Sequence, residues 1–245
     1  NQMRRDFVSN VSHELKTPLA ALMGFIETLL GPARSDAVAQ DRFLKIMNQE
    51  AQRMNRLVSD LLSLSRVEET QRMRPTKTVC LNDVLTSSLE VLQPAAQTAN
   101  VRIDTVGLDQ RVCILGDWDQ LVQVCVNLME NAIKYGGPDT TVILTLVGSQ
   151  YDQTLRKHCA IIRVKDHGPG IEAIHLPRLA ERFYRVDDHR DRKTGGTGLG
   201  LAIVKHIATR HRGRLAVQSQ RGQGAEFSII LPLASEINGE LSSLS

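Results

Sequence analysis

The stretch FVSNVSHELKTPLAALMGFIETLL, residues 7–30, decides the fold of the first part of this chain. Apolar residues recur here at spacings of three and four, which predicts one amphipathic helix from about residue 2 to residue 30. The apolar stripe consists of Met3, Phe7, Val11, Leu15, Leu19, Leu22, Ile26 and Leu30. His13 lies roughly 200° around the helix from its apolar neighbours, because each residue advances the helix by about 100°. We therefore expect an outward-facing imidazole.

Two neighbours distinguish this histidine from an ordinary surface residue. Thr17 follows His13 by one helical turn and shares its face. Pro18 has no N–H for the carbonyl of Glu14, which predicts a bend just after His13. A surface histidine beside a chance proline remains the alternative, and His13 alone does not exclude it.

A second helix is expected over residues 36–69, after a turn that contains Gly31 and Pro32. Its apolar seam follows a 4,3,4,3 pattern: Leu44, Met47, Ala51, Met54, Val58, Leu61 and Ser65. A short turn between two helices makes a helical hairpin, and a hairpin alone buries only one side of each stripe. We therefore expect an all-α helical hairpin that forms a dimeric four-helix bundle, a homodimer. The alternative is a hairpin covered by the following domain.

The composition of the chain argues against several classes of function. The chain has 245 residues and a net charge of +3, too small to indicate nucleic-acid binding. Its four cysteines are far apart in the sequence, which predicts reduced thiols rather than a disulfide frame or a metal site. The sequence has no run of about 18 apolar residues and no signal peptide. Because it begins within or just before a helix and without an initial methionine, we expect a fragment of a longer protein.

After a polar linker at residues 70–78, short strands and helices mix without strict alternation, which predicts an α+β two-layer sandwich. Asn82 or Asp83 is expected to cap the first of these helices, and Asp117 the second. A polar hairpin tip is expected at residues 150–157, and a frayed tail at 235–245. The expected strands cover residues 79–81, 101–106, 111–115, 142–147, 160–165, 215–219 and 225–231, and the helices cover 82–98, a segment from 117 onward, and part of 196–210.

The helix that begins near Asp117 carries a group of polar residues. Asn127, Asn131 and Lys134 follow one another at i, i+4 and i+7, hence on one face, and Tyr135 comes next. Amide oxygens and an ammonium group suit phosphate and a hard cation such as Mg²⁺. The polar outer face of an ordinary amphipathic helix would look much the same.

Two glycine-containing motifs follow. In DHGPGI, residues 166–171, a carboxylate after an apolar strand can accept a hydrogen bond from an amino group while the backbone passes close to a planar ligand. In GGTGLGL, residues 195–201, backbone N–H groups converge at a helix start, which favours anions. It is neither a Walker loop nor a dinucleotide fingerprint. Between them RFYR, residues 182–185, precedes a charged segment, 187–193, which we interpret as a lid. Ordinary turns and an exposed loop are the alternatives.

In this order the motifs resemble those of the sensor histidine kinases of two-component systems, over essentially the whole chain. SHELKTPL, residues 12–19, resembles the H box of that family. Residues 127–135 resemble the N box, 166–171 the G1 box, 182–185 the F box and 196–201 the G2 box. The run at residues 178–187 is most similar to that of the phosphate-responsive sensor kinases.

The resemblance implies a domain organisation. Residues 1–69 would be the HisKA-type dimerisation and histidine phosphotransfer hairpin, 70–77 a linker, 78–233 a Bergerat-type ATP-binding domain and 234–245 a tail. The fragment would be the cytoplasmic portion of a membrane-anchored protein of the bacterial inner membrane.

The resemblance also implies roles for particular residues. His13 would take phosphate from ATP and pass it to an aspartate of a response regulator, with Glu14 as acid/base partner and Thr17 orienting water for dephosphorylation of that regulator. Asp166 would bind the adenine amino group, and Asn131 would hold Mg²⁺. The other expected ATP-binding residues are Asn127, Lys134, Tyr135, Gly168, Gly170, Arg185, Gly196, Gly198, Leu199 and Gly200.

Three rival functions remain open at this stage. A kinase of the same ATP fold could phosphorylate serine on a partner, a degenerate kinase could act as a binding module, or the chain could be an ATPase of the topoisomerase or chaperone sort. The H box argues against the serine kinase, and the intact ATP motifs argue against the binding module. An ATPase of the third kind would have no use for a helical hairpin with an exposed His13. The chain departs from the family pattern at His167, where Asn is common, and at Leu179 and Ala180, where Ile and Phe are common; both changes bear on lid packing.

Overall fold

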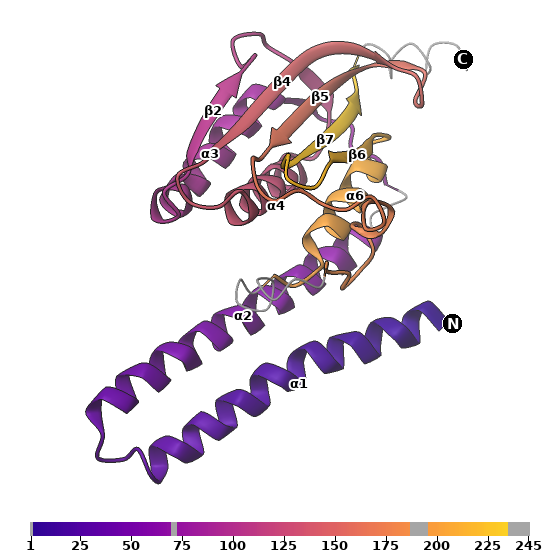
Figure 1. Cartoon of the computed structure of the whole chain (residues 1–245). Helices are drawn as coiled ribbons and strands as arrows, with labels where there is room; N and C mark the ends of the chain where they lie inside the picture. The colour runs from indigo at the N-terminus through magenta and orange to yellow at the C-terminus, as the bar shows by residue number, and fades with distance from the viewer. Residues whose placement is uncertain (1, 70–72, 187–195, 235–245) are drawn as a thin grey trace.

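The computed structural model describes residues 2–69, 73–186 and 196–234, with the side chains of residues 2–6 and 8 left out. They form a long helical hairpin followed by a sheet that helices cover on one face (Figure 1). The expected tail at 235–245 and the expected lid at 187–193 lie outside the described residues. In chain order the elements are α1 (Gln2–Leu30), α2 (Ala37–Glu69), β1 (Thr78–Cys80), α3 (Leu81–Thr98), β2 (Arg102–Val106), β3 (Cys113–Leu115), α4 (Trp118–Gly136), β4 (Thr141–Asp152), β5 (Lys157–Lys165), η1 (Leu176–Arg178), α6 (Gly200–Arg210), β6 (Arg214–Ser219) and β7 (Ala225–Pro232).

The helical hairpin has the bounds that the apolar periodicity predicts. α1 runs without interruption through Pro18, and the Thr17 hydroxyl donates to the carbonyl oxygen of His13 at 3.2 Å. Asp36 caps α2, because its Oδ1 accepts the backbone N–H groups of Val38 and Ala39, both at 3.0 Å. The bend expected just after His13 stays a prediction.

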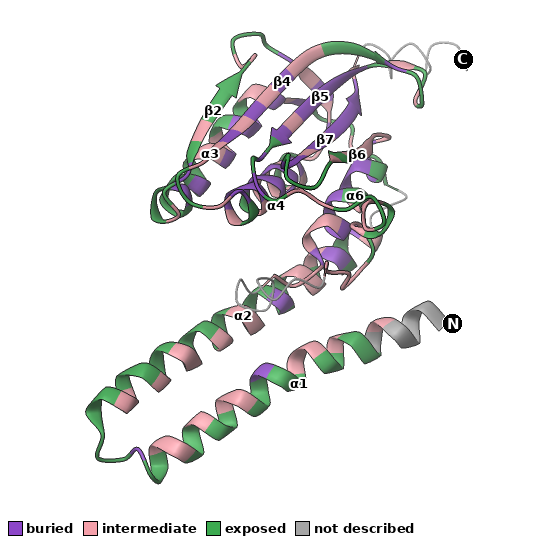
Figure 2. Cartoon of the chain, in the orientation of Figure 1, coloured by how far each residue is buried: buried purple, intermediate pink, exposed green. Residues whose placement is uncertain are grey.

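The apolar surface of the hairpin is covered at one end only (Figure 2). Toward the turn, Ile26 is 44 % exposed, and in α2 Leu44 is 56 % exposed. Near the end of α2, in contrast, Leu57 and Leu64 are buried in the same core as α6. The alternative of a hairpin covered by the following domain therefore holds for the second half of α2 and for part of α1, where Phe7 and Leu15 pack against the same core.

The second half of the chain is the expected two-layer sandwich. Its five-stranded sheet has the order β2-β4-β5-β7-β6, in which β2 and β4 are parallel and the other pairs antiparallel. α3, α4 and α6 pack against one face of this sheet (Figure 1). β1 and β3 form a separate antiparallel ribbon where the chain enters the sandwich.

The hairpin between β4 and β5 is longer than predicted. The strands run as far as Asp152 and resume at Lys157, so only residues 153–156 form the tip. Asp152 is 8 % exposed because its carboxylate pairs with Arg214 of β6, with Nη2 2.6 Å from Oδ2. Oδ1 of Asp152 also accepts the N–H of Leu155 at 2.8 Å. The ion pair between Asp152 and Arg214 thus stabilises the polar end of β4 as part of the sheet.

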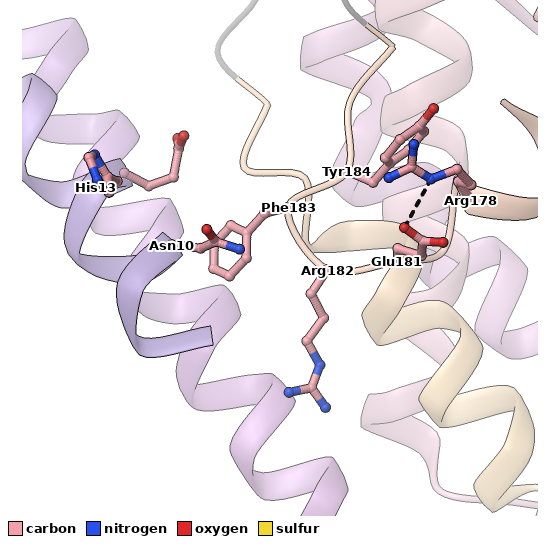
Figure 3. A pocket seen from close by; sticks show the side chains of 8 residues that line it. Asn10, His13, Arg178, Glu181, Arg182, Phe183 and Tyr184 are labelled. Atoms are coloured by element: carbon pink, nitrogen blue, oxygen red, sulfur yellow. Dashed lines mark hydrogen bonds and ion pairs between the residues drawn. The ribbon is translucent and has the colours of Figure 1, made fainter. Parts of the chain in front are cut away.

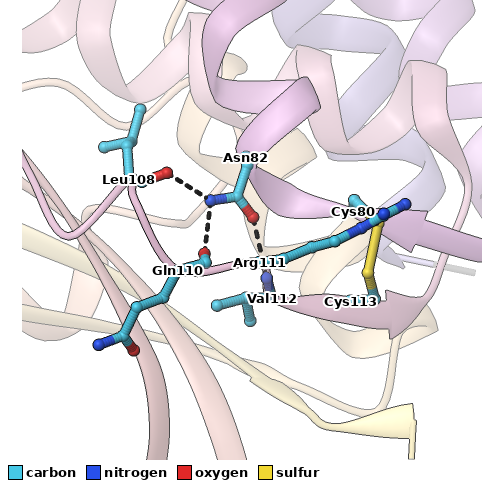
Figure 4. Close-up of a disulfide and its surroundings, with 7 residues drawn as sticks. All are labelled: Cys80, Asn82, Leu108, Gln110, Arg111, Val112 and Cys113. Atoms are coloured by element: carbon cyan, nitrogen blue, oxygen red, sulfur yellow. Dashed lines mark hydrogen bonds between the residues drawn. A yellow bond between two sulfur atoms is a disulfide. The ribbon is translucent and has the colours of Figure 1, made fainter.

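The helix cap expected at Asn82 or Asp83 is wrong, because α3 already begins at Leu81. The Asn82 side chain is used for a contact distant in sequence (Figure 4). Its Nδ2 donates to the carbonyl oxygens of Leu108 at 2.8 Å and Gln110 at 2.6 Å, and its Oδ1 accepts the N–H of Val112 at 2.9 Å. The side-chain amide of Asn82 therefore fixes the loop before β3 instead of capping α3.

The expectation of four reduced thiols is wrong for two cysteines. Cys80 of β1 and Cys113 of β3 are partners in the ribbon and form a disulfide, with Cα atoms 4.1 Å apart (Figure 4). Strand pairing brings them together across 33 positions of sequence, which cysteine spacing alone does not reveal. Cys125 and Cys159 are buried thiols, and burial raises the pKa of Cys125 to about 12.

Candidate functional site

α4 presents the predicted polar face. Asp117 caps this helix, because its Oδ1 accepts the N–H of Gln120 at 3.3 Å. The opposite face is fully buried against the sheet and α3 through Leu121, Val124 and Leu128. The expected site residues Asn127, Asn131 and Lys134 are half-buried and occupy the other side of the helix. The division of faces predicted from the sequence is therefore confirmed.

The glycine segment before α6 approaches this polar face closely. Nδ2 of Asn127 donates to the carbonyl oxygen of Gly200 at 3.4 Å. A Cβ on Gly196 would lie 2.8 Å from Nζ of Lys134. Gly198 has φ +70°, a conformation that favours glycine, and the next residue, Leu199, is fully buried. The segment thus lies directly against the polar side of α4.

Asp166 lies directly after β5 at the C-terminal end of α4. The residue is 4 % exposed, and its Oδ1 accepts the N–H groups of Gly168 at 2.9 Å and Ala225 at 3.2 Å. Burial raises the pKa of Asp166, and these two backbone donors oppose that effect. A Cβ on Gly168 would lie 2.2 Å from the carbonyl oxygen of Tyr135, so only glycine fits there. Gly170 has φ +71°.

An aromatic ring and an ammonium group meet beside this aspartate. Nζ of Lys134 donates to the hydroxyl of Tyr135 at 3.0 Å and lies 4.6 Å from the centre of its ring. The Tyr135 side chain is 40 % exposed. A flat ring, a buried carboxylate acceptor, amide groups and a cation are the chemical groups that suit a purine nucleotide and its phosphates.

His13 is exposed on α1, as predicted. Its neighbour Glu14 is half-buried and forms an ion pair with Arg53 of α2, with Oε2 and Nη2 3.2 Å apart. A pocket of about 400 Å³ opens between this part of α1 and the segment after β5 (Figure 3). It is lined by Asn10, His13, Glu14, Arg178, Glu181, Arg182, Phe183 and Tyr184.

The F box is attached to the helical hairpin. Arg182 forms an ion pair with Glu68 of α2, and its guanidinium lies 5.3 Å from the centre of the Phe7 ring. Phe183 packs against the same ring, with centroids 5.9 Å apart. Arg185, expected to contact phosphate, is half-buried just before residues 187–195, and its role stays a prediction.

The glycine segment is attached to the same helix. The Thr197 hydroxyl donates to Oδ2 of Asp60 at 2.6 Å, and burial raises the pKa of Asp60. Sequence reasoning missed Asp60 and Glu68, because neither stands out on a long amphipathic helix. For Thr197, the one signal in the sequence is its place within the glycine motif of residues 195–201.

Two protein families match separate parts of the chain. The family described as "His Kinase A (phospho-acceptor) domain" matches residues 3–70. The family described as "Histidine kinase-, DNA gyrase B-, and HSP90-like ATPase" matches residues 116–235. The first includes His13, and the second includes the polar face of α4, Asp166 and the glycine segment.

Individual relatives are similar over nearly the whole chain. The phosphate regulon sensor protein PhoR of Pseudomonas aeruginosa is 40% identical over 93% of this chain and 49% of its own length. The sensor histidine kinase RppB of Synechocystis is 37% identical over 96% of this chain and 50% of its own length. The chain therefore spans about half the length of these curated relatives.

A solved structure shares the arrangement of both parts. The crystal structure of full-length ShkA in complex with AMPPNP superposes with a TM-score of 0.63 and 26% identity. It covers 94% of this chain, which in turn covers 46% of that one. With a phospho-acceptor domain on its helical hairpin and an ATPase domain in its sandwich, this chain belongs to the sensor histidine kinases.

Proposed function

We propose that this chain transfers the γ-phosphoryl group of ATP to His13 and then to an aspartate of a separate response regulator. The observation that carries the proposal is the pocket of Figure 3, in which the exposed His13 on α1 and Arg182 and Phe183 of the ATPase domain line one cavity. The acceptor imidazole and the nucleotide domain therefore belong to one continuous surface.

ATP would lie between α4 and the glycine segment. Asp166 would accept the adenine amino hydrogen, the Tyr135 ring would cover the base, and Lys134 and Arg185 would contact phosphates. The close approach of Gly168 to the backbone of Tyr135 and of Gly196 to the side chain of Lys134 supports this placement. The remaining contacts are assigned to Gly170, Gly198, Leu199 and Gly200.

Mg²⁺ fits the amide oxygen of Asn131, with Asn127 beside it, because this cation binds few protein oxygens together with substrate phosphates. When bound, it would neutralise charge on the phosphates. The chain's own contribution is to hold these amides on a rigid helix, where Asn127 is already fixed by its bond to Gly200.

Phosphoryl transfer makes one bond and breaks one. A ring nitrogen of His13 forms the P–N bond with its lone pair while the bond from the γ-phosphorus to the bridging oxygen breaks, and ADP leaves with that electron pair. Glu14 accepts the proton that the imidazole loses. Arg53, 3.2 Å from Glu14, holds that carboxylate in place at the pocket wall.

Thr17 is proposed to orient water for dephosphorylation of the regulator. Its position one turn beyond His13, on an exposed face, supports this role. The Thr17→Ala variant should lose phosphatase activity toward the phosphorylated regulator and keep autophosphorylation. An equal loss of both activities would argue against a separate role for Thr17.

We further propose a homodimer formed by the helical hairpins. The support is the row of large apolar side chains that a single chain leaves exposed on α1 and α2: Leu19, Met23, Ile26, Leu30, Leu44, Val58 and Leu62. A second copy packed as a four-helix bundle would cover them.

The domain division is likewise a proposal: residues 1–69, a linker at 70–77, an ATP-binding domain at 78–233 and a tail. None of the described helices is both long and apolar enough to cross a membrane. We propose that the chain is the cytoplasmic portion of an inner-membrane sensor, as implied by its partial coverage of sensor relatives. Similarity to PhoR favours a regulator of the phosphate-responsive type, which phosphotransfer profiling against a panel of regulators would test.

Incubation with γ-labelled ATP and Mg²⁺ tests the central proposal. The wild-type chain should take up label that is stable in base and labile in acid, as expected for phosphohistidine. His13→Gln should abolish it, while His158→Gln, at an exposed histidine of β5, should not. Acid-stable, base-labile label would indicate a serine kinase, and absence of ATP binding would indicate a binding module.

A further inference from the structure

The disulfide between Cys80 and Cys113 occupies an accessible place in the fold. Both cysteines are half-buried in the ribbon of β1 and β3, whereas Cys125 and Cys159 are fully buried in the sandwich. All four cysteines of the chain lie within the described residues. The protein therefore has one pair of sulfur atoms that a dissolved reagent can reach and two internal thiols for comparison.

The two sulfur atoms of the pair have different surroundings (Figure 4). Nε of Arg111 donates to Sγ of Cys80 at 3.3 Å. Cys80 is also the residue at the N-terminal cap of α3, an 18-residue helix whose free N–H groups favour negative charge. A guanidinium group and a helix N-terminus both stabilise a thiolate, which is the attacking and leaving form of sulfur in disulfide exchange. The asymmetry marks Cys80 as the reactive sulfur.

We propose that Cys80 and Cys113 form a reversible thiol–disulfide exchange site, with Cys80 as the attacking thiolate, Cys113 as the resolving thiol and a small-molecule disulfide as the oxidant. The Cys80 thiolate attacks one sulfur of the oxidant and releases one small thiolate, which leaves a mixed disulfide on Cys80. The Cys113 thiolate then attacks the Cys80 sulfur and releases the second small thiolate. The protein pair loses two electrons, and the small disulfide gains them.

The position of the pair connects this chemistry to the kinase. β1 follows directly after the segment that leaves the helical hairpin, and Gly116, after β3, donates its N–H to the carbonyl oxygen of Lys77 at 2.8 Å. Arg210 joins the same segment to α4, because it binds the carbonyl oxygen of Met73 at 3.0 Å and Oδ2 of Asp117 at 3.0 Å. Oxidation therefore fastens the ribbon between the helical hairpin and the cap of the helix that carries the candidate ATP-binding residues.

Oxidised glutathione is a suitable probe for the site. The reduced full-length chain, freed of reductant, is incubated with the probe, quenched in acid and alkylated in denaturant, and its peptides are weighed. We expect a Cys80–Cys113 crosslink with Cys125 and Cys159 fully alkylated, and recovery of four alkylated thiols after dithiothreitol. Crosslinking that involves Cys125 or Cys159, or four alkylated thiols after prolonged oxidation, would overturn the proposal.

Single-cysteine variants then show which of the two sulfur atoms attacks the oxidant. Cys113→Ser should accumulate a glutathione adduct on Cys80, while Cys80→Ser should form an adduct on Cys113 roughly tenfold more slowly. Equal rates, or a faster reaction at Cys113, would refute the assignment.

Arg111→Gln keeps both cysteines and alters one exposed side chain, so it separates reactivity from folding. It should slow crosslinking by roughly threefold or more, because a thiolate loses its neighbouring positive charge. Arg102→Gln, at an exposed arginine of β2, is the matched control and should leave the rate unchanged. An Arg111→Gln rate equal to that of the wild type would remove Arg111 from the mechanism and contradict the proposed activation of Cys80.

Discussion

Replacement of Asp166 by Asn changes one hydrogen-bonding atom and little else. Oδ1 of Asp166 accepts the N–H groups of Gly168 and Ala225, and the amide oxygen of Asn can accept both. Oδ2 takes no part in those two bonds, and in the variant its place is taken by an NH₂ group. The loop after β5 should therefore keep its structure, while the proposed acceptor for the adenine amino group becomes a donor.

The expected loss follows from the charge of the acceptor. A hydrogen bond to a charged group contributes about 1.5–3 kcal/mol, so ATP should bind roughly 10 to 150 times more weakly to Asp166→Asn. Inosine triphosphate carries a carbonyl oxygen where ATP carries the amino group, and the new NH₂ can donate to it, at about 1 kcal/mol. The preference for ATP over inosine triphosphate should thus fall on the order of a hundredfold.

Isothermal titration of both nucleotides into the full-length chain measures this preference. Asp152→Asn is the matched control, since it alters another buried aspartate at the far end of β4 and should leave both affinities unchanged. If Asp166→Asn weakened both nucleotides equally, the residue would hold the loop rather than read the base. In the wild type, ATP binding should weaken as the pH falls toward the pKa of Asp166, which burial raises above its ordinary value.

Three further outcomes are expected. Asp152→Ala should lower the free energy of urea unfolding by about 2 kcal/mol at neutral pH; the hydrogen bond from Arg214 holds the pKa of Asp152 below its ordinary 3.8, so this advantage should be present above that pH and lost as the pH falls further. The disulfide of Cys80 and Cys113 closes a loop of 33 positions, so reduction should lower the unfolding free energy of the sandwich by about 3.7 kcal/mol in urea titrations with and without reductant. Gly168→Ala should abolish ATP binding in titration, because its Cβ would lie 2.2 Å from a backbone oxygen of α4; unchanged affinity would show that the loop can retreat.

Features that depend on neighbours in sequence could be predicted. The bounds of α1 and α2, the Asp117 cap and the polar face of α4 follow from helical periodicity and from hydrogen bonds within one turn. Helical periodicity also predicts an outward-facing His13, and this residue is exposed.

Features that depend on tertiary contacts could not be predicted. Asn82 has the chemistry of a helix cap, yet carbonyl groups more than 25 positions away hold its amide. Cys80 and Cys113 show no motif, because strand pairing alone makes them neighbours. Asp152 resembles a loop residue until Arg214 is brought beside it. In each case a polar side chain had several possible partners, and only the packing of the sheet selected one.

The two contacts of α2 with the ATPase domain have a geometric consequence. Asp60 holds Thr197 and Glu68 holds Arg182, on either side of residues 187–195. Eight residues of helix separate the two acidic anchors, which is about 12 Å along the axis and roughly 80° around it. A rotation of α2 about its axis would therefore move Thr197 and Arg182 in different directions, so a twist that reaches α2 changes the separation of these two residues.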